Sequence, residues 1–559
     1  IGNDITGNEA SASKTVRSEA LETETSLPNF RQGDAIILYE RNRDTDNVTN
    51  KMVFKGNIEY LTENEIGIRL RATQQNPSVL PAESLYAIEH DTMDTTFRSM
   101  YQGLYIYLSA RKERRDLLLS QRPPRFDESL DSMISRSEDD FTRIALKAKA
   151  AQDYFLLIGP PGTGKTSCAL KKMVETFHAD KDAQILLLSY TNRAVDEICK
   201  SLASIAPAVD FIRVGSELSC DEAYRGHLIE NELSSCNRRS EVYERIRNCR
   251  IIVGTVAAIS GKPELFRLKH FDVAIIDEAT QILEPQLLGI LCARGEDGKD
   301  AIDKFVLIGD HKQLPAVVQQ NTEQSAIYDE SLLSIGLTNL KDSLFERLYR
   351  NCTATVHRSY DMLCRQGRMH PEVALFANRA FYGGRLIPVG LPHQIESSDT
   401  ICRLAFYPSV PEKAGASAKI NYSEARIVAD LAVRIYEDHQ ADFDESRTLG
   451  IITPYRSQIA LIKKEIESLG IPALNRILVD TVERFQGSER DVIIYSFCVN
   501  YPYQLKFLSN LTEEEGVLID RKLNVALTRA RKQMFITGVS ELLERNPLYK
   551  SLLKLIESF

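Results

Sequence analysis

The chain has 559 residues, which is too long for a single hydrophobic core and indicates several domains. Its composition, 43% hydrophobic and 26% charged, is that of a globular protein. No apolar run reaches the roughly 18 residues that a membrane span needs, so we expect no membrane partner. The net charge of −9 excludes a chain that is basic overall, although a protein can confine positive charge to one groove.

The ten cysteines stand singly between Cys168 and Cys498, without a C-x-x-C pair. This pattern argues against a zinc or iron–sulfur site and against a disulfide framework. It favours an intracellular location, either cytoplasmic or nucleoid-associated. The chain begins at Ile1 without an apolar signal segment, so we expect it to belong to a longer or processed protein that could carry an upstream domain.

The first 122 residues change character once. Residues 1–27 are rich in Ser, Thr, Glu and Asn, and their lack of apolar periodicity predicts a disordered segment or linker. Residues 28–122 are expected to form an accessory unit. Alternating stretches such as 35–39 and 65–70 predict a small β-barrel, and the apolar spacing over 97–119 predicts one long stalk helix.

Beyond residue 122, continuous apolar runs alternate with helical stretches. Runs without polar alternation are typical of parallel strands buried on both faces. They predict two consecutive doubly wound α/β domains, at 123–350 with a short insertion at about 216–250, and at 351–559, with the switch near 346–360. The expected strands are 155–158, 185–188, 251–253, 273–276 and 305–308 in the first domain, and 449–452, 492–495 and 534–537 in the second.

Residues 159–166 match the pattern G-x-x-x-x-G-K-[ST], directly after an expected strand and before an expected helix at 167–177. In such a loop, backbone N–H groups and the helix dipole bind phosphates. Lys165 is expected to reach the β- and γ-phosphates, and Thr166 to bind Mg²⁺. The residues expected to form the rest of the phosphate cradle are Gly159, Pro160, Gly162, Thr163 and Gly164. The alternative, a glycine-rich turn that binds nothing, is disfavoured by the strand–loop–helix context.

Two acidic residues, Asp277 and Glu278, follow the expected strand 273–276, at the carboxyl edge where α/β proteins bind ligands. We expect Asp277 to hold Mg²⁺ and Glu278 to activate the attacking water. An acidic pair of this kind is more often a solvated turn, but its pairing with a phosphate loop favours hydrolysis. Arg368 and Arg529 are candidates for the positive charge that hydrolysis needs, although either alone is more often a surface ion-pair partner.

The motifs together resemble those of the superfamily 1 helicases. Segments 159–166, 277–281, 309–315 and 366–371 resemble motifs I to IV; 480–489 and 524–531 resemble motifs V and VI; 189–192 and 254–256 resemble motifs Ia and Ic. They stand in the family's order over roughly residues 126–540. The subgroup that the chain resembles most contains the nonsense-mediated-decay RNA helicase and the helicase half of the Okazaki-fragment nuclease–helicase. The resemblance implies two tandem RecA-like P-loop domains, preceded by the small β-barrel and helical stalk.

The resemblance also implies roles for single residues. Gln313 would sense the γ-phosphate, and Arg368 and Arg529 would be arginine fingers supplied by the second domain. Gly487 and Glu489 would contact the ribose and phosphates of the nucleotide and couple these contacts to closure of the two domains. The residues implied to line the nucleic-acid track are Thr191, Asn192, Thr255 and Thr481. Members of the subgroup move 5′ to 3′ on a single strand.

Two positions depart from the family's pattern. Phe141 stands where relatives carry a glutamine that reads adenine, and Gly367 stands where the subgroup carries a tyrosine that packs on the base. Both changes concern the base and leave the phosphate chemistry intact. They predict weak discrimination between ATP and other nucleoside triphosphates.

The sequence therefore predicts an ATP- and Mg²⁺-dependent helicase or translocase acting on single-stranded nucleic acid. DNA is favoured over RNA because the layout before the first domain resembles that of the nuclease–helicase relatives. One alternative is a nucleotide-gated clamp or RNA-directed remodelling ATPase without processive unwinding. Another is a P-loop NTPase that acts on protein partners, against which the motif Ia, III and V segments argue.

Overall fold

The computed structural model describes residues 14–17, 30, 33–62, 64–72, 74, 76–91, 95–318, 320–321, 323–355, 357–397, 401–412, 417–514 and 516–558. The chain forms two compact units, residues 1–98 and residues 99–559. Across the described ranges, no helix has the length and apolar character to cross a membrane.

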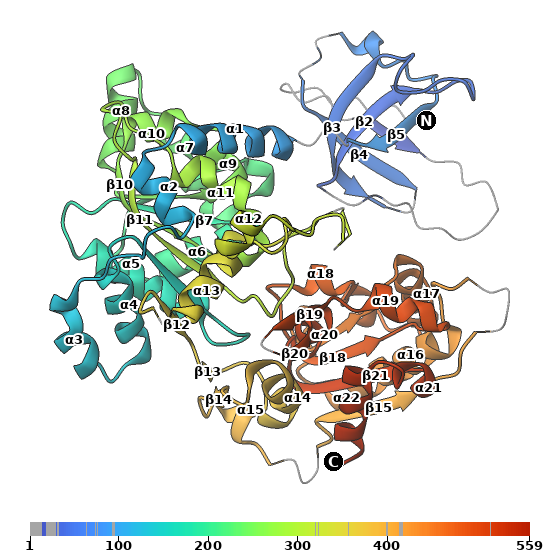
Figure 1. Ribbon diagram of the computed structural model, residues 1–559. Coiled ribbons are helices and arrows are strands. Elements are labelled where there is room, and N and C mark those ends of the chain that lie inside the picture. Colours follow the sequence, from blue (N-terminus) through green and yellow to red (C-terminus); the bar gives the residue numbers. More distant parts are fainter. Residues whose placement is uncertain are drawn as a thin grey trace. The chain divides into compact units, whose positions relative to one another are not determined.

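The first unit is a five-stranded antiparallel sheet with the order β1-β4-β3-β2-β5 (Figure 1). Its strands are β1 (Lys14–Arg17), β2 (Ala35–Glu40), β3 (Val53–Leu61), β4 (Glu65–Leu70) and β5 (Tyr86–His90). Its core residues, among them Ile36, Leu38, Ile58 and Ile68, alternate along their strands with more exposed positions. Among the described residues of this unit, no hydrogen-bonded ladder joins the edge strands β1 and β5. These ladders therefore form an open sheet and do not close the predicted barrel.

The prediction of a disordered segment or linker over 1–27 is wrong at residues 14–17, which form β1 and pair with β4. A four-residue edge strand within a polar stretch has too little apolar alternation to be recognised from the sequence. Residues 1–13 and 18–27 lie outside the described residues.

The predicted stalk helix over 97–119 is two helices, α1 (Thr95–Ser109) and α2 (Lys112–Leu118). Arg111, between them, has an extended backbone with ψ of 142°. Arg114 is buried and donates hydrogen bonds to the carbonyl oxygens of Ile302 and Asp303. The break therefore coincides with packing on the neighbouring sheet, a tertiary effect that helix periodicity does not show.

The second unit, residues 99–559, contains two large parallel sheets, and we call the part of the chain built on each sheet a lobe. The first lobe is built on a seven-stranded sheet with the order β12-β6-β11-β10-β7-β9-β8 (Figure 1). Its strands are β6 (Tyr154–Ile158), β7 (Ile185–Ser189), β8 (Phe211–Val214), β9 (Ile251–Thr255), β10 (Phe271–Ile276), β11 (Ile302–Gly309) and β12 (Tyr360–Met362). The five predicted strands are confirmed as β6, β7, β9, β10 and β11. β12 pairs with β6, so this lobe continues past the predicted boundary at residue 350 and past the predicted switch at 346–360.

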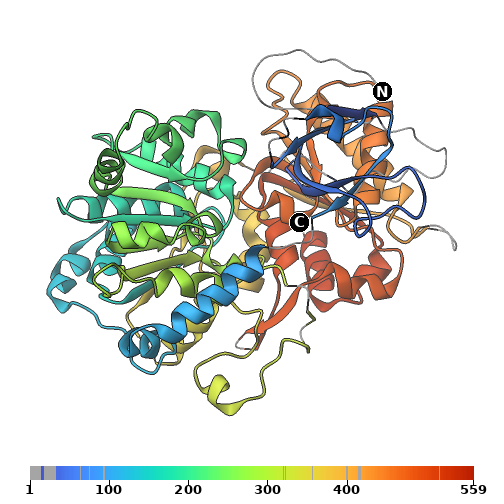
Figure 2. The same cartoon turned by 90° about the horizontal axis from the view of Figure 1, so that it is seen from above.

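Helices cover both faces of this sheet, and two separate hydrophobic clusters fill the space beneath them. The helices are α3 (Asp131–Arg136), α4 (Asp140–Ala150), α5 (Lys171–His178), α6 (Asn192–Ala203), α7 (Ile229–Glu232), α8 (Arg239–Asn248), α9 (Val256–Ser260), α10 (Glu264–Leu268), α11 (Glu284–Leu291), α12 (Glu330–Ser334) and α13 (Leu344–Ala354). Helices α7 and α8 occupy the stretch predicted as an insertion. α1 lies along this lobe, where Gly103 leaves room for the backbone of α11 (Figure 2).

The second lobe is built on a parallel five-stranded sheet with the order β15-β21-β18-β16-β17. Its strands are β15 (Leu404–Pro408), β16 (Leu449–Ile452), β17 (Leu478–Asp480), β18 (Arg490–Ser496) and β21 (Ala530–Gly538). The predicted strands are confirmed as β16, β18 and β21. The two tandem parallel sheets confirm the predicted α/β fold class.

Nine helices and two small ribbons complete the second lobe. The helices are α14 (Pro371–Tyr382), α15 (Pro392–Ile395), α16 (Tyr422–Asp438), α17 (Arg456–Ser468), α18 (Val482–Phe485), α19 (Leu505–Leu508), α20 (Arg521–Leu527), α21 (Ser540–Leu543) and α22 (Pro547–Glu557), counted over the described residues. The ribbons pair β13 (Arg365–Gln366) with β14 (Ile387–Pro388), and β19 (Leu511–Glu514) with β20 (Val517–Asp520).

Glu424 of α16 is a buried carboxyl group in this lobe whose hydrogen-bond donors are neutral. It accepts hydrogen bonds from the Ser496 hydroxyl at 2.7 Å and from the Cys498 amide at 2.9 Å. Burial raises its pKa to about 7 from an ordinary value of 4.5. The folded state therefore favours the protonated carboxyl group.

This raised pKa predicts a loss of stability as the pH rises from about 4.5 to 7. In that window the unfolded chain ionises Glu424 before the folded chain does, so the cost reaches about 3 kcal/mol above pH 7. Glu424→Gln, which cannot ionise, should have a flatter dependence of unfolding free energy on pH. Denaturant titrations of both proteins at pH 5 and pH 8 measure the difference. Equal pH dependence in the two proteins would contradict the assignment.

Candidate active site

The phosphate loop follows β6 and has the backbone shape that its glycines permit. Gly162 and Gly164 have φ angles of +74° and +77°, which L side chains rarely adopt. The Thr163 hydroxyl donates to the Pro160 carbonyl at 2.7 Å and braces the loop. The helical segment after it starts at Lys165, two residues before the predicted start, as a π-helical turn that continues into α5.

The loop brings the predicted lysine and threonine onto the predicted acidic pair. A Cβ atom on Gly159 would lie 2.0 Å from Lys165 Cγ, so glycine is required for the lysine to fold over the loop. Lys165 Nζ lies 3.3 Å from Glu278 Oε1, and the Thr166 hydroxyl donates to Asp277 Oδ2 at 2.5 Å. The structure therefore joins motifs I and II as the sequence predicts.

The two carboxyl groups of this pair differ in electrostatics. Burial, aided by the nearby charge of Glu278, raises the pKa of Asp277 to about 6. Burial also opposes ionisation of Glu278, but the charge of Lys165 and a hydrogen bond from Gln281 outweigh it and lower its pKa. Glu278 is thus ionised at neutral pH, as a general base must be. The Thr166 hydroxyl and the Asp277 carboxylate are hard oxygen donors of the kind that Mg²⁺ prefers.

Two predicted residues from different lobes meet behind this pair. The buried Gln313 side chain donates to Asp310 Oδ2 at 2.8 Å and accepts from Arg529 Nη2 at 3.2 Å. Burial and the nearby charge of Arg368 lower the pKa of Arg529, yet its guanidinium stays protonated at neutral pH. A positive charge from the second lobe is therefore fixed beside the proposed phosphate sensor.

Arg368 lies against the tip of the phosphate loop. The Gly367 amide donates to the Gly162 carbonyl at 2.9 Å, and a Cβ atom on Gly162 would lie 2.4 Å from Arg368 Cβ. The Arg368 guanidinium donates to Glu489 Oε2 at 2.5 Å. Gly487, with φ of +76°, forms the turn two residues before that glutamate.

The predicted nucleic-acid residues lie at the carboxyl edges of both sheets. Thr191 and Thr255 cap helices α6 and α9 by accepting from the Ala194 and Ala258 amides at 3.2 and 3.1 Å, which leaves each hydroxyl proton able to donate. Asn192 begins α6. β7 and β9 are neighbours, so these residues share one edge.

The two threonines on that edge differ in accessibility. Thr191 is exposed, whereas Thr255 is only 8% exposed and offers little contact surface. Thr481 follows β17 at the edge of the second sheet. The structure therefore brings three of the four predicted residues to one sheet edge and places the fourth on the other lobe.

The two departures from the family pattern lie close to the phosphate loop. A Cβ atom on Gly164 would lie 3.5 Å from Phe141 Cζ, so the Phe141 ring of α4 borders the loop. Gly367 is flanked by the aliphatic side chains of Val389 and Leu391. The Phe141 side chain offers an aromatic face but no amide with which to read a base.

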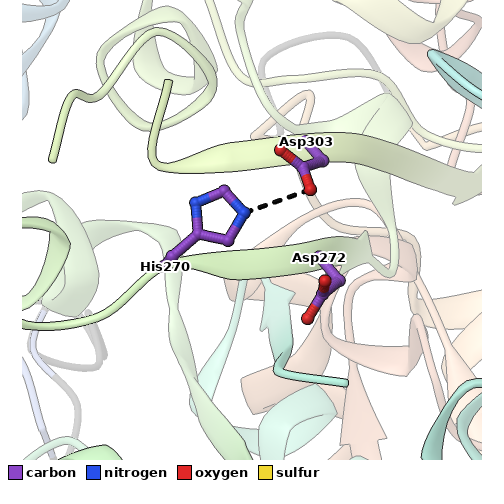
Figure 3. A group of neighbouring side chains, drawn as sticks. All are labelled: His270, Asp272 and Asp303. Carbon is purple, nitrogen blue, oxygen red and sulfur yellow. Dashed lines mark ion pairs between the residues drawn. The ribbon is translucent and has the colours of Figure 1, made fainter. Parts of the chain in front are cut away.

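A separate group of potential metal ligands lies at the opposite, amino-terminal edge of the first sheet. Figure 3 shows His270 before β10, Asp272 on β10 and Asp303 on β11. His270 Nε2 lies 3.1 Å from Asp303 Oδ2, and both side chains are at least half exposed. Asp272 Oδ2 accepts a hydrogen bond from the backbone N–H of Gln184 at 2.6 Å. His270 and Asp303 thus form an exposed pair beside the carboxylate of Asp272, which a backbone N–H already binds. The group lies at the edge of the sheet opposite the phosphate loop.

Sequence reasoning missed several side chains that join the lobes. Arg521 of α20 and Glu346 of α13 form a buried ion pair at 2.5 Å. Tyr382, at the end of α14, donates to the Asp310 carboxylate at 2.7 Å. Motif VI contains Asn524, which also takes part in these contacts, but no local pattern indicates Tyr382 or the ion pair.

Two protein families, both described as AAA domain, match the chain, one at residues 136–242 and 229–321 and the other at 340–541. DNA replication ATP-dependent helicase/nuclease DNA2 of Gallus gallus is 28% identical over 507 residues, covering 87% of this chain and 46% of that protein. The Arabidopsis thaliana protein JHS1, which has the same description, is 27% identical, and the match covers 97% of this chain and 40% of that protein. DNA polymerase alpha-associated DNA helicase A of Saccharomyces cerevisiae is 24% identical, and the match covers 82% of this chain and 73% of that protein.

The chain thus spans about half the length of the helicase/nuclease relatives that it matches. A solved structure described as a complex of Arterivirus nonstructural protein 10 (helicase) with DNA aligns with 72% of the chain at 16% identity, but its TM-score of 0.36 is too low to indicate a shared overall arrangement. The family matches cover both lobes, and the motifs I to VI stand in order across them. Each of the two families described as AAA domain matches one lobe, and with its motifs I to VI the chain is similar to the superfamily 1 helicases of the DNA2-like group.

Proposed function

We propose that this chain is an ATP-dependent DNA helicase that translocates 5′ to 3′ on a single strand. The observation that carries the proposal is the meeting of two half-sites. Lys165 and Glu278 of the first lobe are in contact, and Arg529 of the second lobe reaches Gln313 of the first. A hydrolytic site completed by two lobes couples each turnover to their relative movement.

In the proposed reaction, Lys165 leaves Glu278 to bind the β- and γ-phosphates of ATP. Glu278, held by Gln281 at its other oxygen, would then accept a proton from the water that attacks the γ-phosphorus, while the bond to the β,γ-bridging oxygen breaks and ADP leaves. Thr166 and Asp277 would hold Mg²⁺, which supplies positive charge to the phosphates. The helicase family implies use of a nucleotide, and ATP with Mg²⁺ fits these donors.

Single-stranded DNA is the proposed track, and the activity then belongs in a compartment that holds DNA. Two of the three relatives described above are named for DNA replication and the third as a DNA helicase. Thr191, Asn192 and Thr481 offer hydroxyl and amide groups at sheet edges, which suit contacts to the phosphate backbone without reading bases.

The direct test is unwinding of duplexes that carry either a 5′ or a 3′ single-stranded tail, in DNA and in RNA. We expect ATP-dependent unwinding of the 5′-tailed DNA duplex and none with Lys165→Ala. ATP hydrolysis without unwinding of any duplex would contradict the proposal and favour a nucleotide-gated clamp. Preferential unwinding of RNA would contradict the choice of DNA.

A second prediction concerns nucleotide selectivity. Because Phe141 borders the loop without an amide, and Gly367 offers no ring to pack on the base, we expect comparable kcat/KM values for ATP and GTP. Restoring a reader with Phe141→Gln should shift the preference toward ATP by about tenfold, the size of one or two added hydrogen bonds. A hundredfold preference for ATP in the wild type would contradict this prediction.

A further inference from the structure

A buried tyrosine of the second lobe holds the motif III segment of the first lobe. The Tyr382 hydroxyl donates to Asp310 Oδ2 at 2.7 Å, and the Gln313 amide donates to the same oxygen at 2.8 Å. Asn524 Nδ2 donates to the Tyr382 oxygen at 2.8 Å and to the Lys312 carbonyl at 2.7 Å. We call Asp310, Gln313, Tyr382 and Asn524 the Tyr382 cluster.

The cluster is buried and is supported by two packed helices. Tyr382 ends α14 and Asn524 lies in α20, and these two helices pack on each other within the second lobe (Figure 1). Tyr382 and Asp310 are each 1% exposed, so water does not compete for their hydrogen bond. Burial, together with the charge of Asp310, raises the pKa of Tyr382, so the phenol is a proton donor at neutral pH.

The geometry fixes the orientation of Gln313. Its amide nitrogen donates to Asp310, and its amide oxygen accepts from Arg529 at 3.2 Å. If Tyr382 lost its hydroxyl, Asp310 Oδ2 would keep only Gln313 as a side-chain donor, and the carboxylate could rotate away. The proposed γ-phosphate sensor would then lose one of its two fixed neighbours.

We propose that Tyr382 is a positioning residue for ATP hydrolysis. Its hydroxyl holds Asp310, and through Asp310 it holds Gln313 in the orientation that hydrolysis requires. Because the tyrosine belongs to the second lobe and motif III to the first, the sensor is correctly placed only while the lobes are in contact. This inference rests on the proposed function, since it assigns a role within the same site.

Tyr382→Phe removes only the hydroxyl. We expect kcat for ATP to fall by about tenfold, with KM for ATP changed by less than about twofold, because Tyr382 does not touch the nucleotide loop. The backbone amides of residues 310–314 should exchange with deuterium faster than in the wild type, because Asp310 anchors the Lys312 amide at 3.1 Å.

Tyr549→Phe is the matched control. The Tyr549 hydroxyl also donates to a buried carboxylate, Asp520 Oδ2 at 2.8 Å, in the same lobe. This control should cost similar stability yet leave kcat and the deuterium exchange of amides 310–314 as in the wild type. If Tyr382→Phe behaves like Tyr549→Phe, the hydroxyl is merely structural and the proposal is wrong.

A double-mutant cycle tests the route of the effect. If Tyr382 acts through Gln313, the double variant Tyr382→Phe/Gln313→Ala should be no slower than Gln313→Ala alone. Losses that multiply would overturn the proposed route. Hydrogen exchange at residues 310–314 decides the positioning claim even if the wild type hydrolyses no ATP, so failure of the proposed function remains distinguishable from failure of this inference.

Discussion

Replacing Arg529 with alanine is expected to lower kcat for ATP by about a thousandfold, the lower end of the range for arginine fingers. Arg529 is a buried cation, 2% exposed, that reaches Gln313 across the lobes. Loss of its charge removes compensation for the negative charge that develops as the γ-phosphate leaves. Arg529→Lys should recover only part of the rate, because a lysine lacks the planar fork of donors. Steady-state ATP turnover measures both variants.

The control for this prediction is another buried arginine of the second lobe. Arg403 is also 2% exposed and pairs with Glu396 at 3.1 Å, and neither residue belongs to one of the motif segments. Arg403→Ala should cost stability but leave kcat within about threefold of the wild type at a temperature where both variants are folded. An Arg529→Ala variant with turnover as high as that of Arg403→Ala would contradict the assigned role.

Removing one partner of the Arg521–Glu346 ion pair is expected to lower the free energy of unfolding by about 3–5 kcal/mol. Both side chains are buried, and their charged atoms lie 2.5 Å apart. Burial opposes ionisation of Glu346, but the charge of Arg521, the Ser343 amide and the charge of Arg350 together outweigh it and lower the carboxyl pKa. Arg521→Ala would leave that carboxylate with only the Ser343 amide and hydroxyl as donors.

The pair joins α20 of the second lobe to α13 of the first, so its loss should weaken contact between the lobes. Denaturant unfolding compares Arg521→Ala with Arg358→Ala, which breaks an exposed ion pair with Asp131 and should cost at most about 1 kcal/mol. The double change Arg521→Met/Glu346→Leu should restore much of the loss. Equal, small effects of Arg521→Ala and Arg358→Ala would show that the buried pair does not hold the lobes.

The phosphate end of the site is the part that the sequence predicts well. A P-loop is one contiguous segment, and its required glycines and lysine can be read locally. Asp277 follows a continuous apolar run, so its place at the carboxyl edge of a buried strand follows from the same pattern. The structure places Lys165 beside Glu278 and Thr166 beside Asp277, and the roles of these residues toward a nucleotide stay predictions.

Contacts between distant segments could not be predicted in the same way. Tyr382 and Asp310 are 72 residues apart, and Arg521 and Glu346 are 175 residues apart. Asp310 lies in the motif III segment, but no local pattern distinguishes Tyr382, Arg521 or Glu346 from ordinary core or surface positions. The break between α1 and α2 has the same origin, since Arg114 bonds to carbonyls of the neighbouring sheet. Short strands such as β12 carry too few residues for a recognisable period.

The proposed coupling between the two lobes and a nucleic-acid track is tested most directly by one rate. ATP turnover should be measured with no polymer and with saturating single-stranded DNA. If the strand favours the arrangement in which Arg529 and Gln313 complete the site, turnover should rise at least about tenfold on adding DNA, and Lys165→Ala should show no turnover in either condition. Turnover that is robust without polymer and unchanged by DNA would contradict a nucleic-acid-coupled motor.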